Sequence, residues 1–114
     1  MLDTGDGAAI CFLGDPEEAL QSALLMRDLL VHNSGLPEGG GDLMLWPEPN
    51  EFTRADILAG LAHIPPAYGF RAGYAYDNTL YIVAGELAAA VGGASYEALL
   101  QREVFAPLAL ARCR

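Results

Sequence analysis

The sequence predicts a mostly α fold of about four or five helices joined by long loops. Residue types that cap helix N-termini occur at Asp15, Thr53 and Ser95, each just before a segment with helical apolar spacing. A long apolar run follows Asn78, as expected for a buried helix. Because no segment alternates polar and apolar residues in the manner of a half-buried strand, we expect little or no sheet.

The first helical segment is predicted from Asp15 onward. Asp15 can cap it, Pro16 suits the first helical position, and Glu18 completes a capping box. The apolar face of the segment then changes phase. This change predicts a break near Ser22 and a second short helix that ends at residues 32–35, "HNSG".

Residues 36–52 form the longest predicted loop, because they contain three prolines and three consecutive glycines. Large apolar side chains such as Leu43 and Trp46 predict that this loop packs onto the domain. The next helix begins after Thr53, where Asp56 completes a second capping box.

Two further helices are predicted in the second half of the chain. Residues 79–93 are apolar on nearly all sides and should form the central, buried helix. Ser95 then caps the last helix, and Pro107 closes it.

The composition describes one acidic domain. The 114 residues are 53% apolar and 18% charged, with a formal net charge of −9. A surface of this charge repels phosphate backbones and anionic lipids, so we expect neither nucleic-acid nor membrane binding. The high apolar content predicts that one face packs against a partner, such as a second copy of the chain in a homo-oligomer.

No cofactor is expected from the sequence. Cys11 and Cys113 lie near opposite ends of the chain without the spacing of a metal site, and we expect free thiols. No cluster of metal-ligating residues has helical spacing. The first dozen residues lack the basic segment and long apolar run of a signal peptide or spanning helix, and the cellular location stays open.

Three segments resemble parts of a known family. They read "RDLLVHNSGLPEGGGDLMLWP", "FRAGYAYDNTLYIVAGEL" and "YEALLQREVFAPLAL". In this order they resemble the middle part of serine hydrolases related to class C β-lactamases, a family that includes D-alanyl-D-alanine carboxypeptidases (penicillin-binding proteins) and esterases. The likeness covers residues 24–112. We therefore divide the chain into an unmatched N-terminal segment, 1–21, and a helical-domain segment, 22–114.

The resemblance implies a fold of two parts with a catalytic cleft between them. One part is an α/β domain with an antiparallel sheet, and the other is the helical domain, which is the part this chain contains. The implied reaction is acyl transfer from a β-lactam, a D-alanyl-D-alanine peptide or an ester to a serine, followed by hydrolysis. The family uses an S-x-x-K motif, a Tyr-x-Asn motif and a K-T-G-like strand motif.

The triplet Tyr76, Asp77 and Asn78 matches the Tyr-x-Asn motif. The resemblance implies that the Tyr76 phenol shuttles a proton between the nucleophile and the leaving group. It also implies that Asn78 presents its amide to the substrate carbonyl and to the lysine. Asp77 stands where the family more often has serine, and we treat it as a candidate substrate contact beside Asn78.

The other two motifs do not occur in these residues. All six basic residues are arginines, and none of Ser22, Ser34 and Ser95 has a lysine three positions later. A tyrosine phenol ordinarily titrates at about 10, so it needs nearby cations to act as a base at neutral pH. We therefore expect the chain alone to be inactive as a hydrolase.

Other interpretations of these residues stay open. Four tyrosines could be packing residues of a core: Tyr68, Tyr74, Tyr76 and Tyr81. The chain could also be a free-standing helical module that binds a protein or a ligand without catalysis. His32 and Ser34 suggest a serine–histidine pair, but we expect a structural role for them, since residues two apart at a helix end rarely face each other. His63 is expected at a helix C-terminus or on the surface.

Overall fold

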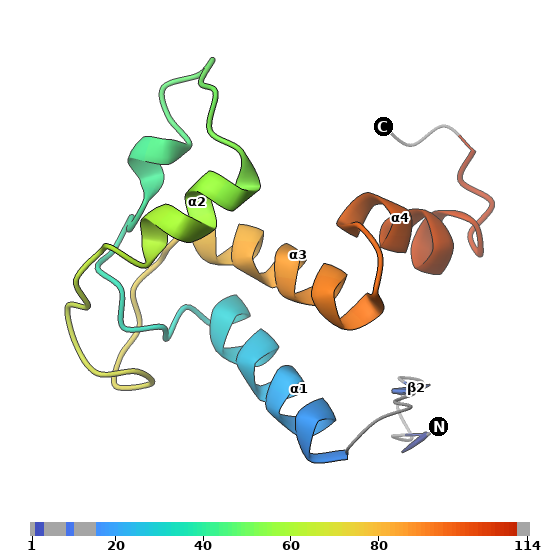
Figure 1. The fold of residues 1–114 in the computed structure, drawn as a ribbon. Coiled ribbons are helices and arrows are strands. Elements are labelled where there is room, and N and C mark those ends of the chain that lie inside the picture. The colour runs from blue at the N-terminus through green and yellow to red at the C-terminus, as the bar shows by residue number, and fades with distance from the viewer. Residues whose placement is uncertain (1, 4–8, 11–15, 112–114) are drawn as a thin grey trace.

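The computed structural model describes residues 2–3, 9–10 and 16–111, with side chains from Glu17 onward. Over these residues the chain has four α-helices: α1 (Pro16–Leu30), α2 (Arg54–Leu61), α3 (Thr79–Gly92) and α4 (Tyr96–Leu100) (Figure 1). A 3₁₀-helix, η1 (Asp42–Met44), lies in the long loop, and a π-helical turn, η2 (Gln101–Phe105), follows α4. The described strands, β1 (Leu2–Asp3) and β2 (Ala9–Ile10), are two residues each and pair antiparallel. The prediction of a mostly α fold without a sheet domain is confirmed.

Helix α3 is the centre of the described fold. It packs against α1, α2 and α4 (Figure 1). Its first half is buried through Leu80 and Ala84, which share the core with Ile57 of α2 and with Ala75 of the preceding loop. The predicted central position is confirmed, but the expected burial holds only for this first half, because Val91 near the C-terminus of α3 is exposed.

Helix α1 runs without interruption, so the predicted break near Ser22 is wrong. No glycine or proline occurs between residues 17 and 30, and most of these residues favour helix. The change of apolar phase that suggested the break is caused by Arg27 and Asp28. Asp28 is turned inward and only 2% exposed, because it forms ion pairs there. The predicted N-cap, Asp15, lies outside the described residues.

The Asp28 carboxylate joins the C-terminal turn of α1 to the loop that precedes α3. Its Oδ1 accepts a hydrogen bond from Arg27 Nη2 at 2.8 Å. Its Oδ2 accepts from Arg71 Nε at 2.8 Å and from Arg71 Nη2 at 2.6 Å. Arg71 and Arg27 together lower the pKa of Asp28 from 3.8 to about 2. The loop is therefore fastened to α1 by a charge-assisted contact.

Gly35 allows the chain to turn back under this loop. It has a φ of +92°, and a Cβ there would lie 2.7 Å from the backbone oxygen of Tyr68. Its carbonyl accepts hydrogen bonds from the N–H groups of Ala67 and Tyr68. The segment that ends α1 thus lies directly against the segment that leads to α3.

The predicted caps of the later helices are confirmed. Thr53 Oγ1 accepts from the Asp56 N–H at 3.2 Å, and the Asp56 carboxylate accepts from the Thr53 N–H at 2.8 Å. Ser95 Oγ accepts from the Ala98 N–H at 3.2 Å. Helical structure after Ser95 ends at Phe105, before Pro107, as the sequence predicts.

The long loop packs only in part. Gly41 has a φ of +83°, and a Cβ there would lie 2.9 Å from Leu61 and 3.0 Å from Thr79, so glycine allows η1 to approach α2 and α3. Leu43 is 89% exposed and Trp46 is half exposed. The prediction that these side chains pack onto the domain is wrong for Leu43, because η1 turns it outward without burying any of its own residues. None of the described helices is long and apolar enough to cross a membrane.

The ion pairs of Asp28 predict a specific acid sensitivity. The folded-state pKa lies below the ordinary value, so the stability that Asp28 contributes is complete above pH 3.8 and is lost as the pH falls towards about 2. We expect Asp28→Asn to unfold at lower urea concentration than the unchanged chain at neutral pH, and the two unfolding curves to converge as the pH falls towards 2. Urea titrations followed by circular dichroism over this pH range measure the effect.

Glu103→Gln is the matched control, because Glu103 pairs with Arg102 in an exposed ion pair that contributes little to stability. This variant should keep the acid dependence of the unchanged chain. A difference in unfolding urea concentration between Asp28→Asn and the unchanged chain that stays constant down to pH 2 would contradict the stabilising role of the Asp28 ion pairs.

Candidate functional site

The triplet of Tyr76, Asp77 and Asn78 connects the loop of residues 69–75 to the first turn of α3. The Tyr76 side chain is 49% exposed, the Asp77 side chain is fully buried, and Asn78 is partly exposed. Asn78 occupies the N-cap position of α3, but its side chain makes no capping hydrogen bond. Tyr76 and Asn78 therefore both reach the surface, one on either side of the buried Asp77.

His32 is the packing partner of this triplet. It is buried just after α1, and its ring centroid lies 4.7 Å from that of Tyr76, 5.5 Å from that of Tyr81 and 5.8 Å from that of Tyr74. Its Nδ1 accepts a hydrogen bond from the Asp77 N–H at 3.2 Å. This bond assigns the ring proton of the neutral imidazole to Nε2.

Backbone hydrogen bonds pair the same two segments. The His32 carbonyl accepts from the Ala75 N–H at 3.0 Å, and the Asn33 carbonyl accepts from the Arg71 N–H at 2.9 Å. Both His32, with a φ of +59°, and Arg71, with a φ of +63°, have left-handed backbone conformations. Such conformations are costly for non-glycine residues and persist only where surrounding contacts hold them. The loop that carries Tyr76 is thus held at several points along its length.

Ser34 and His32 do not form a catalytic pair. Ser34 Oγ accepts from the Leu36 N–H at 3.1 Å, while His32 Nδ1 is engaged by the Asp77 N–H. The structural role expected for the "HNSG" segment is confirmed. His63, just beyond α2, is exposed, as the sequence predicts.

Asp77 is turned into the protein, towards the glycine-rich loop. Its Oδ1 lies 2.7 Å from Thr79 Oγ1 and 3.3 Å from the Thr79 N. Burial raises the pKa of Asp77, and the nearby carboxylate of Asp42 adds to this rise. In this conformation the Asp77 carboxyl group does not face the solvent beside Tyr76. It is therefore not positioned to contact a substrate directly.

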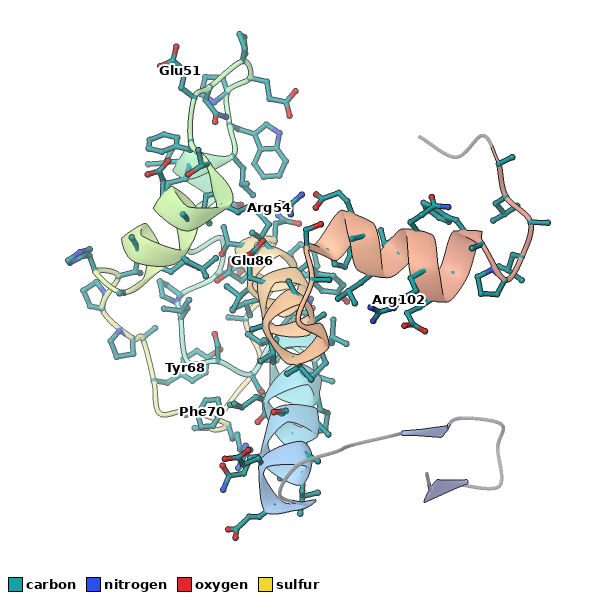
Figure 2. The ribbon with its side chains drawn as sticks, turned by 45° about the vertical axis from the view of Figure 1, so that its right-hand side comes forward. Glu51, Arg54, Tyr68, Phe70, Glu86 and Arg102 are labelled. Carbon is teal, nitrogen blue, oxygen red and sulfur yellow. The ribbon has the colours of Figure 1, made fainter. Side chains whose placement is uncertain are left out.

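The aromatic residues before the triplet cover the side of α1. Figure 2 shows Tyr68 and Phe70 on the loop beside this helix. The Tyr68 ring lies under Gly73, where a Cβ would be 3.3 Å from a ring carbon. Phe70 lines an apolar hollow of about 220 Å³ with Leu25 and Leu29 of α1. Tyr68 is largely packed, whereas Phe70 and Tyr76 are both about half exposed.

A second polar cluster lies where α2, α3 and α4 meet. Arg54 forms ion pairs with Glu86, at 3.4 Å, and with Glu97, and Figure 2 shows Arg54 beside Glu86. Arg54 and Glu86 border a hollow of about 280 Å³ with Tyr81 and Tyr96. Exposed ion pairs of this kind bring three helices together but contribute little stability each.

The sequence did not identify the contacts that hold the site. The role of Asp28 with Arg71, the ring contacts of His32 and the burial of Asp77 were all missed. One signal was available in the sequence, the charged residues Arg27 and Asp28 on the apolar side of α1. A charged side chain on such a face is expected to be buried only when it is paired, so these residues indicated an ion pair. Across the described residues, no group of three or more His, Cys, Asp or Glu side chains could hold a metal ion.

Comparison with known proteins identifies the family. A family model described as Beta-lactamase matches residues 16–114. The unguisins hydrolase UngD of Aspergillus violaceofuscus (strain CBS 115571) is 30% identical over 98 residues, which are 86% of this chain and 17% of that protein. Crystal structures of the D-amino acid amidase from Ochrobactrum anthropi SV3, complexed with L-phenylalanine or D-phenylalanine, match with a TM-score of 0.56 and 30% identity.

The match covers only part of each relative. The solved amidase structures cover 74% of this chain, and the chain covers 23% of the amidase. The sequence thus spans about a fifth of the length of these relatives, and the part that it spans contains the helices and the Tyr-x-Asn triplet. Because the family model matches residues 16–114, which are most of the chain, the chain belongs to the beta-lactamase family of hydrolases.

Proposed function

We propose that this chain forms the helical wall of an acyl-transfer site in a serine hydrolase, with Tyr76 as the proton carrier and Asn78 as the contact to the substrate carbonyl. One observation supports the proposal most directly. Tyr76 is half exposed and Asn78 is partly exposed, while the residue between them is buried and its N–H is bonded to His32. Such an arrangement holds two polar groups at fixed positions before any substrate arrives, as catalysis requires.

An amide is the substrate class that the relatives favour. One similar protein is named as an unguisins hydrolase and the other as a D-amino acid amidase. We propose an amide bond next to a D-amino acid or in a peptide as the bond that the complete site cleaves, with a β-lactam or an ester as the alternatives.

The reaction needs groups that these residues do not supply. The nucleophile would be a serine whose proton passes through the Tyr76 phenol to the leaving group. A phenol accepts this proton at neutral pH only beside a cation. The described arginines are each paired with a carboxylate: Arg27 and Arg71 with Asp28, Arg54 with Glu86 and Glu97, and Arg102 with Glu103. We therefore propose that the chain is inactive by itself and needs a serine and a lysine from elsewhere.

A chimeric enzyme tests these roles. The segment of this chain that matches the Ochrobactrum anthropi amidase, 74% of the chain's length, would replace the corresponding segment of that amidase, which supplies the remaining parts of the site. We expect this chimera to hydrolyse a D-amino acid amide, and Tyr76→Phe to lower its kcat by roughly 10²- to 10⁴-fold, as expected for loss of a general acid–base. Steady-state kinetics of ammonia release measure the effect.

Two controls accompany the chimera. Tyr74→Phe is the matched variant, because Tyr74 also contacts the His32 ring but stands outside the triplet, and it should keep the activity of the chimera. The isolated 114-residue chain should neither hydrolyse the amide nor be acylated by penicillin. Equal kcat values for Tyr76→Phe and Tyr74→Phe would refute the role of Tyr76, and an acyl-enzyme of the isolated chain would refute its inactivity.

A second candidate function, association without catalysis, is favoured by one apolar groove. The groove has a volume of about 380 Å³ and is lined by residues of α1, α3, α4 and η2, among them Met26, Leu87, Val91 and Leu99. Burial of such a surface is a driving force for pairing. We propose that two copies of the isolated chain bind each other through this groove.

This association should respond to salt. Each chain has a formal charge of −9, so added salt screens the repulsion between copies and should strengthen the dimer. Val91→Asp should weaken it, while Leu43→Asp, which changes an exposed residue outside the groove, should not. Sedimentation equilibrium at low and high salt measures both effects. A monomer under both conditions at high protein concentration would disprove the association.

A further inference from the structure

The side chain of Thr79 has one proton and two close acceptors. Its Oγ1 lies 2.8 Å from the carbonyl oxygen of Gly40 and 2.7 Å from Asp77 Oδ1. A hydroxyl group donates a single hydrogen bond and accepts through its two lone pairs. The Gly40 carbonyl has no proton to give. If Asp77 were ionised, three oxygens would therefore share one proton, and one of the two short contacts would be a repulsion between lone pairs.

A proton on Asp77 would supply the second proton that the two short contacts of Thr79 need. We infer that Asp77 is present in this fold as the neutral carboxylic acid, which donates from Oδ1 to Thr79 Oγ1, while the Thr79 hydroxyl donates to the Gly40 carbonyl. Both short contacts are then hydrogen bonds with one proton each. The resulting chain of bonds links the triplet to the glycine-rich loop of residues 39–41.

The surroundings of Asp77 agree with a neutral group. Asp77 and Thr79 are both 0% exposed, and Asp77 Oδ2 is buried without a hydrogen-bond partner among the described residues. A buried carboxylate oxygen without a donor is costly, whereas the carbonyl oxygen of an acid costs much less. Gly40 lies directly against this oxygen, because a Cβ there would be 3.0 Å from Asp77 Oδ2.

The charges that face Asp77 also favour its proton. Asp42 of η1 faces Asp77, and its negative charge raises the pKa of Asp77. The hydrogen bonds between Thr79 and Asp77 Oδ1 act in the opposite direction, and a positive charge on His32 would also lower this pKa. Burial is the largest cause, and the pKa of Asp77 is raised on balance. The hydrogen bonds of this neutral group then hold the backbone between Tyr76 and Asn78 in place. Asp77 is in this sense a positioning residue, and that consequence for catalysis rests on the function proposed above.

Carboxyl carbon NMR tests the proton directly. In the 114-residue chain labelled with ¹³C at the aspartate carboxyl groups, we expect the Asp77 signal to keep the shift of an acid in the pH range where Asp28 and Asp56 are already ionised. The pKa values of those two groups are lowered by their hydrogen bonds, so they provide an internal reference. Asp42→Asn should move the Asp77 titration to lower pH. An Asp77 signal that titrates together with or below Asp56 would overturn the inference.

Two pairs of variants separate this chain of bonds from simple packing. Asp77→Asn should keep the ring-current shifts of Tyr76 against His32, because an amide N–H can donate to Thr79 as the acid does, while Asp77→Ala should lose them. Thr79→Ser should likewise keep them and Thr79→Val should not. If Asp77→Asn loses these shifts as completely as Asp77→Ala, the inference is wrong. None of these measurements uses a substrate, so their outcome is independent of whether Tyr76 proves to be catalytic.

Discussion

The ion pair between Asp28 and Arg71 joins the two chain segments on which the candidate site is built. One segment ends α1 and includes His32, and the other leads through Arg71 and Ala75 into α3. The carboxylate is buried, so removal of the Arg71 guanidinium would leave Asp28 with one of its two arginine partners, Arg27. The backbone bonds that follow, from Arg71 to Asn33 and from Ala75 to His32, continue the same contact towards the triplet. Each such bond contributes about 0.5–1.5 kcal/mol, so the order of the loop depends on several of them together.

The helices and loops of the candidate site mainly hold polar side chains in position. Tyr76 and Asn78 are polar groups presented at fixed positions, and their support comes from His32 below and from the chain of bonds through Thr79 beside them. The described arginines are occupied by carboxylates. This division of roles agrees with a family in which the relatives are four to six times longer than the matched segment.

Local features of the fold were predictable from the sequence, and distant contacts were not. The caps at Thr53 and Ser95 depend on residues three positions away, so their pattern is visible in the sequence. The continuity of α1 was missed because the Asp28 charge, which helps to break its apolar pattern, is satisfied by Arg71, 43 residues further along. Tyr76 and Asn78 were found through the family resemblance, but the burial of Asp77 depends on Gly40 and Thr79, which meet only in the folded chain.

Hydrogen exchange at the amides of Arg71, Ala75 and Asp77 tests the central claim that the Tyr76 loop is held by the segment after α1. These three N–H groups donate to Asn33, to the His32 carbonyl and to His32 Nδ1. We expect exchange by NMR about as slow as at the buried first turns of α3, and faster exchange at all three amides in Asp28→Asn. Exchange at the rate of an unstructured peptide, while the amides of α3 remain protected, would contradict it.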